Sequence, residues 1–176
     1  KAYTEVYKEQ ADPVTYYAQL APNELYFQEV IEKLAFRYMD FKKYDMTISL
    51  LRTFAERTAS PQKVVLLYQD ILVRIPPEKR LEIPTKEMRY LLEKYRQWVT
   101  YYALSENDKQ ESYAFFEKHV RELGTKSHDI AKKESSPDKK KKLLLRTIDF
   151  YKLYLSYFGT SRYRVEIAMN IGDSYF

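Results

Sequence analysis

Apolar residues recur along the chain with the period of an α-helix. One such stripe runs from Leu91 to Tyr102 through Tyr95 and Trp98, and a second runs from Leu144 to Phe158. No segment alternates between apolar and polar residues with turn signals at both ends, so the pattern predicts no β-strand. The sequence therefore predicts an all-α protein with helices over 3–10, 13–20, 23–41, 44–58, 61–75, 85–104, 108–134, 138–158 and 162–176.

Short local signals place the ends of these helices. Asp12-Pro13, Ser60-Pro61 and Ser136-Pro137 each combine a capping side chain with a proline suited to the first helical position. Gly159 follows an apolar stripe and is a candidate C-terminal stop. Three prolines prevent residues 76–84 from being helical throughout, so we expect a loop there. Whether the long 108–134 helix breaks at Gly124 is left open by the sequence.

The amino-acid composition favours a folded protein and disfavours several classes of functional site. The 176 residues are 45% hydrophobic, 31% charged and 16% aromatic, which is typical of a chain with a packed core. Three glycines disfavour the glycine-rich loops that hold nucleotide phosphates, and the absence of cysteine excludes disulfides and thiol chemistry. No apolar run approaches the roughly 18 residues needed to span a bilayer.

Positive charge is concentrated in one segment. Residues 126–146 hold eight Lys or Arg against three acids, which accounts for the whole net charge of +5. The run Lys139, Lys140, Lys141 and Lys142 is a candidate site for phosphate, an acidic peptide or an anionic membrane surface. The alternative is a solvated helix start.

Signals for catalysis are weak. His119 and His128 lie nine positions apart, without the spacing of a helical metal pair. Ser136 and Lys139 match a Ser-x-x-Lys motif of acyl enzymes, but a helix cap followed by a lysine run explains them as well. We therefore expect no enzyme activity, no metal and no cofactor.

A small residue recurs beside large apolar ones at helical spacing. The segments that carry it are Ile31 to Tyr38 with Ala35, Val120 to Ser127 with Gly124, and Ala168 to Tyr175 with Gly172. This pattern resembles the first helix of tetratricopeptide repeats. Two further segments resemble the family's second helix, with threonine where alanine is usual. Their matching residues are Thr47, Leu51, Phe54 and Pro61 in one, and Thr147, Tyr151 and Tyr154 in the other.

The resemblance implies a right-handed α-solenoid of stacked antiparallel helix hairpins. Residues 1–22 would then be an N-terminal helical extension, and 23–176 a repeat segment with an irregular middle repeat at 76–110. In the family, first helices line a concave groove that binds a protein or peptide. The groove positions that carry over are Glu32, Phe36, Met39, Val65, Gln69, Leu72, Arg121, Thr125, His128, Met169 and Asp173.

The expected function is that of a non-enzymatic scaffold or adaptor for a protein partner. The tyrosine-rich style is similar to bacterial cell-envelope members of the family, which implies a periplasmic or outer-membrane-linked assembly. Two alternatives stay open: binding of nucleic acid or an anionic surface through 126–146, and a regulatory domain of a larger enzyme. Residues 162–176 resemble a first helix without its second. We therefore expect either that the parent protein continues past Phe176 or that this end docks on another chain, such as a second copy.

Overall fold

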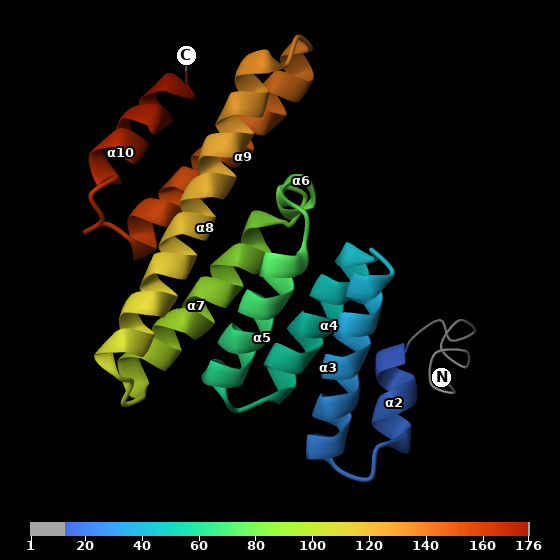
Figure 1. Cartoon of the computed structure of the whole chain (residues 1–176). Coiled ribbons are helices and arrows are strands. Elements are labelled where there is room, and N and C mark those ends of the chain that lie inside the picture. Colours follow the sequence, from blue (N-terminus) through green and yellow to red (C-terminus); the bar gives the residue numbers. More distant parts are fainter. Residues whose placement is uncertain (1–12, 176) are drawn as a thin grey trace. The chain divides into compact units, whose positions relative to one another are not determined.

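The chain folds into helices (Figure 1). The computed structural model describes residues 13–175, and these form nine helices and no strand, which confirms the all-α prediction. The predicted helix 3–10 and the Asp12 cap lie outside the described residues. The helices are α2 (Pro13–Leu20), α3 (Glu24–Asp40), α4 (Tyr44–Arg57), α5 (Pro61–Arg74), α6 (Pro77–Arg80), α7 (Thr85–Tyr101), α8 (Glu106–Lys133), α9 (Pro137–Tyr157) and α10 (Arg164–Asp173).

Side-chain caps explain where α3, α5 and α8 begin, the last through Ser105. The Asn23 side chain accepts a hydrogen bond from the Tyr26 amide at 2.8 Å, and Ser60 accepts one from the Lys63 amide at 3.3 Å. Ser136 occupies the N-cap position of α9, but its side chain makes no capping bond. Gly159 lies just beyond α9 without a positive φ, so the helix does not end in a left-handed glycine.

The proline-rich segment divides the chain. Of residues 76–84, only Pro77–Arg80 is helical, as the single turn α6. Two compact units meet at this segment, Lys1–Pro76 and Pro77–Phe176. In the first unit α2 packs against α3, so residues 13–22 share a unit with the hairpin that follows them.

The first unit is built around the α3–α4 hairpin, on which α5 packs (Figure 1). Ala35 of α3 is fully buried at the place where α4 crosses, and the Thr47 hydroxyl donates to its carbonyl oxygen at 3.4 Å. At the other end of the hairpin, Arg57 pairs with Glu24 at 2.5 Å and lies over the Phe27 ring. The core comprises chiefly Phe27, Ile31, Leu51, Val64, Tyr68 and Ile71.

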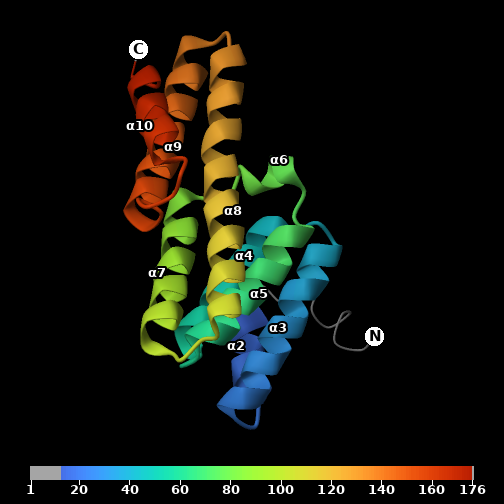
Figure 2. The ribbon, with the colours of Figure 1, turned by 60° about the vertical axis from the view of Figure 1, so that its left-hand side comes forward.

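The second unit is built around a longer hairpin of α8 and α9, with α7 and α10 against it (Figure 2). Helix α8 continues through Gly124 without a break for 28 residues. Gly124 is buried, and a Cβ built on it would lie 2.6 Å from the Tyr151 ring of α9. The two backbones therefore approach more closely than any larger residue would allow.

We predict that Gly124→Ala destabilises the second unit by about 1–3 kcal/mol, because the fully buried Tyr151 ring has no room to move away. Gly172 is the matched control. A Cβ there meets nothing within 4 Å, so Gly172→Ala should raise stability by up to about 1 kcal/mol through helix propensity. Urea unfolding followed by circular dichroism measures both changes. Equal effects of the two substitutions would contradict the close crossing.

Candidate binding groove and polar cluster

A groove lies between α3 and α5 in the first unit. It has a volume of about 470 Å³, and Phe54 of α4 also lines it. Its apolar part includes Leu25, 59% exposed, and Leu66, 48% exposed, beside the half-buried Phe36. The remaining lining residues are Gln28, Glu29, Glu32, Lys63, Leu67 and Asp70.

The polar rim of the groove is mainly acidic. Asp70 is paired with Arg74 at 3.0 Å on its own helix. Glu29 and Glu32 make no ion pair within the described part of the chain, and both are accessible. Lys63 is the cation that lines the groove. An apolar floor with free carboxylates beside it favours a ligand that combines apolar and cationic groups.

The resemblance-based groove positions are only partly at this surface. Glu32 and Phe36 line the groove. Met39, Val65 and Leu72 are buried in the core, so they cannot face a partner, and this part of the expectation is corrected. Gln69 is half-buried. The exposed stripe of α5 is Leu66, Asp70 and Val73, which lies one residue later than expected.

The one-residue error on α5 has a physical origin. The segment Val64–Tyr68 is apolar at every position, so a helical period cannot tell which of its side chains faces outward. The charged neighbours Lys63 and Asp70 lie one turn before and after Leu66, and they were the signal that marked the outer face.

A second hollow adjoins the groove. It has a volume of about 380 Å³ and lies between α2 and α3, with Tyr17, Tyr26, Val30 and Leu34 among its lining residues. Glu29 lines both hollows, so they meet on α3 and together extend the accessible surface of this helix.

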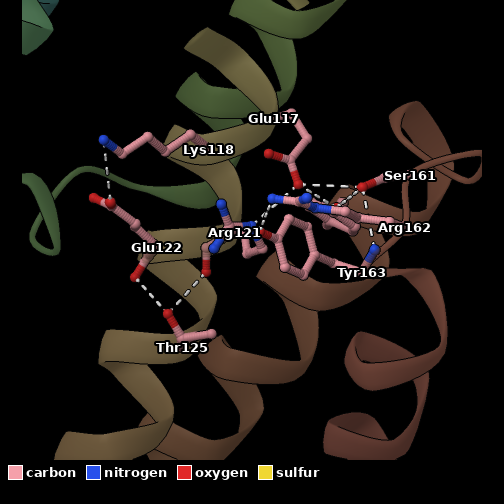
Figure 3. Close-up of polar contacts among 9 residues, drawn as sticks. Glu117, Lys118, Arg121, Glu122, Thr125, Ser161, Arg162 and Tyr163 are labelled. Atoms are coloured by element: carbon pink, nitrogen blue, oxygen red, sulfur yellow. Dashed lines mark hydrogen bonds and ion pairs between the residues drawn. The ribbon is translucent and has the colours of Figure 1, made fainter. Parts of the chain in front are cut away.

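In the second unit, a cluster of polar groups is centred on the buried carboxylate of Glu117. Tyr154 of α9 donates its hydroxyl to Glu117 at 2.5 Å, and Arg121 donates its Nε at 3.1 Å. Ser161, from the turn between α9 and α10, reaches the same oxygen at 3.3 Å. Arg121 also lies 4.0 Å from the centre of the Tyr163 ring (Figure 3). The cluster fastens α8 to α9 and to the start of α10.

The remaining groove positions expected from the resemblance lie on α8 and α10, and they differ in burial and in contacts. Arg121 belongs to this cluster, and the Thr125 hydroxyl donates to the Arg121 carbonyl within α8 (Figure 3). His128 is buried, and its Nδ1 lies 3.2 Å from the Tyr151 hydroxyl. On α10, Met169 is 67% exposed, and Asp173 is exposed as well. Arg121, Thr125 and His128 therefore join helices together or stabilise α8, whereas the two α10 residues face solvent.

The four lysines of the run, Lys139–Lys142, are all exposed in the first turns of α9. Among residues 13–175, no group of three or more His, Asp or Glu is placed to hold a metal ion. None of the described helices has both the length and the apolar composition needed to cross a bilayer.

Comparison with known proteins finds no matching family model, no matching curated protein and no matching solved structure.

Two tyrosines provide a matched test of the Glu117 cluster. Tyr154 donates to the buried Glu117, whereas Tyr157 donates to Glu93, whose side chain is 41% exposed. Burial and, to a smaller extent, the hydrogen bond to the carboxylate raise the pKa of both hydroxyls, that of Tyr157 to about 12.

We predict that Tyr154→Phe lowers the free energy of unfolding by about 1–2 kcal/mol, because it removes a donor from a carboxylate whose side chain is only 10% exposed. Tyr157→Phe should cost less than about 1 kcal/mol, since solvent can replace the lost bond. Denaturant unfolding compares the two variants. A larger loss for Tyr157→Phe would rule out the assigned role of Glu117.

His119 gives the second unit a dependence on pH. Its ring is 6% exposed and stacks on Phe115, and its Nε2 has no hydrogen-bond partner in the described chain. Burial and, to a smaller extent, the positive charges of Arg80 and Lys126 together lower the pKa of His119 to about 4. Between pH 6.5 and 4 the unfolded chain therefore binds a proton that the folded chain does not.

We predict that the free energy of unfolding falls by roughly 2–3 kcal/mol as the pH decreases from 6.5 to 4 on account of this group. His119→Phe should remove that part of the pH dependence. Urea unfolding at several pH values measures it, and the difference between wild type and variant cancels carboxylates that titrate in the same range. Identical pH profiles would show that the ring is not excluded from water.

Proposed function

We propose that this chain is a non-enzymatic interaction module that binds a protein or peptide segment in the groove between α3 and α5. The observation that carries the proposal is the exposure of Leu25 and Leu66 on opposite sides of a hollow with an apolar floor. Large aliphatic side chains that gather around a concavity are typical of recognition surfaces.

The size and composition of the groove suit a peptide. Its volume of about 470 Å³ accommodates a few side chains of a helix or an extended segment. Phe36 offers an aromatic surface on which an aliphatic side chain can pack, and Arg74 lies 5.0 Å from the centre of the same ring. The adjoining hollow beside Tyr17 and Tyr26 would lengthen the contact along α3.

Charge indicates the chemistry of the partner. Glu29 and Glu32 are accessible carboxylates without ion pairs in the described residues, so a Lys or Arg on the partner would gain a charge-assisted contact. We therefore propose a partner segment with aliphatic residues one helical turn apart and cationic residues beside them.

The packing within the two hairpins supports the proposal that they are arranged like tetratricopeptide repeats. In each unit a small residue, Ala35 or Gly124, lies in the core of a hairpin whose second helix carries a buried threonine, Thr47 or Thr147. Both hairpins thus use the features that carried the resemblance in the sequence. A right-handed solenoid built from such hairpins, with first helices along its concave side, is the arrangement we propose.

Selection from a displayed library of random peptides tests the groove. We predict that peptides enriched on the wild-type chain combine aliphatic and cationic residues. Leu66→Glu should weaken a labelled, synthesised winner by at least about tenfold, because it puts a charge onto the apolar floor. Fluorescence anisotropy measures the dissociation constant.

Val73→Glu is the matched control, since Val73 is 60% exposed on the same helix but does not line the groove. It should leave the affinity unchanged. Glu29→Gln combined with Glu32→Gln should reduce both the affinity and its dependence on salt. Failure to enrich any peptide, or equal binding by Leu66→Glu and wild type, would contradict the proposal.

A further inference from the structure

The α8–α9 hairpin is longer than its counterpart in the first unit, and its free end carries the positive charge. Helices α8 and α9 have 28 and 21 residues, compared with 17 and 14 for α3 and α4. In the second unit, the end of the hairpin formed by the last turns of α8 and the first turns of α9 extends beyond the start of α7 (Figures 1 and 2). The end of α8 and the start of α9 form the free end of the hairpin, alongside α10, and we call this end the hairpin tip (residues 126–146).

All but one of the lysines of the hairpin tip lack an ion pair within the described part of the chain. Lys126 pairs with Glu122 at 3.6 Å. Six others are exposed and form no ion pair among the described residues: Lys132, Lys133, Lys139, Lys140, Lys141 and Lys142. Of the three acids of the tip, Glu134 accepts a hydrogen bond from the Ser136 amide. A strong positive field is therefore left at this end of the hairpin.

Exposed aliphatic residues lie among these charges. Ile130 is 45% exposed, with Lys126 and Lys133 one helical turn away on either side. Leu145 is 54% exposed, with Lys141 and Lys142 one turn before it. An aliphatic side chain flanked by lysines matches the boundary between lipid headgroups and acyl chains, where lysine stems extend outward and the apolar group enters.

The residue types of the hairpin tip disfavour a nucleic acid or a specific acidic peptide. Residues 126–149 contain no Phe, Tyr or Trp on which a base could stack. The one arginine, Arg146, is half-buried and donates to the Ile83 carbonyl at 2.9 Å. The exposed cations are thus all lysines, which act as flexible point charges, whereas arginine provides the planar fork that recognises individual carboxylates or phosphates.

We propose that the hairpin tip is a peripheral membrane-binding element that docks on a bilayer containing anionic phospholipids. The lysines would supply the attraction to the surface charge, and Leu145 and Ile130 would enter the interface to a shallow depth. The inference is independent of the proposed groove, because it concerns residues of the second unit and a different ligand.

Vesicle co-sedimentation tests the proposal with the full chain. The probes are vesicles of phosphatidylcholine alone and vesicles of phosphatidylcholine mixed with phosphatidylglycerol. We expect binding only to the mixed vesicles, weakened by added salt. The variant with Lys139, Lys140, Lys141 and Lys142 all changed to Gln should bind at least about tenfold more weakly.

Two matched controls separate local from general effects. Changing the exposed Lys33, Lys42, Lys86 and Lys118 to Gln lowers the net charge by the same amount and should leave binding nearly unchanged. Leu145→Gln should weaken binding severalfold, whereas Leu20→Gln, at a residue 61% exposed on α2, should not. Circular dichroism confirms that each variant is folded.

Three results would overturn the proposal. One is the absence of binding to the mixed vesicles. Another is an equal loss of binding in the two lysine variants. The third is binding of a labelled single-stranded oligonucleotide by a chain that does not bind vesicles, since this would assign the hairpin tip to nucleic acid.

Discussion

The second unit depends on one close contact, between the backbone of Gly124 and the ring of Tyr151. The ring occupies the space that a side chain at position 124 would need, so α8 and α9 are held at short distance. The Tyr151 hydroxyl then lies 3.2 Å from Nδ1 of His128 on α8. The buried Tyr151 of α9 thus contacts α8 through both its ring and its hydroxyl. The Glu117 cluster joins α8 and α9 nearer the other end of the hairpin and adds the turn before α10.

The hairpins of the two units share a small residue and a buried threonine in their cores, but the surfaces of the two units differ in charge. Ala35 and Thr47 join the shorter hairpin, and its neighbour α5 leaves an apolar groove with free carboxylates. Gly124 and Thr147 belong to the longer hairpin, whose additional turns carry lysines. Each unit has its own core, so the acidic, apolar groove and the lysine-rich hairpin end are supported by separate sets of buried residues. The proposed peptide groove and the proposed membrane contact therefore depend on different residues.

Local patterns were enough to locate the helices. Eight of the predicted segments correspond to helices of the described chain, since each is marked by apolar residues at helical spacing and by prolines, caps or loops at its ends. The resemblance also named Glu32 and Phe36, which line the hollow between α3 and α5. The cluster around Glu117 did not follow from the sequence, because Tyr154, Ser161 and Tyr163 come from segments far along the chain from Glu117 and Arg121.

The sequence by itself determined the helical class, the approximate helix ends and the concentration of lysines in 126–146, because all three depend on residues close together in the chain. Tertiary structure decided which face of α5 is exposed, which put Leu66 at the surface and Val65 in the core. It also decided that α8 stays continuous at Gly124. The sequence alone does not show that this glycine makes room for the Tyr151 ring where α8 and α9 cross. Helical periodicity acts within a few turns, whereas burial depends on the elements that pack against a helix, and these are set by the whole fold.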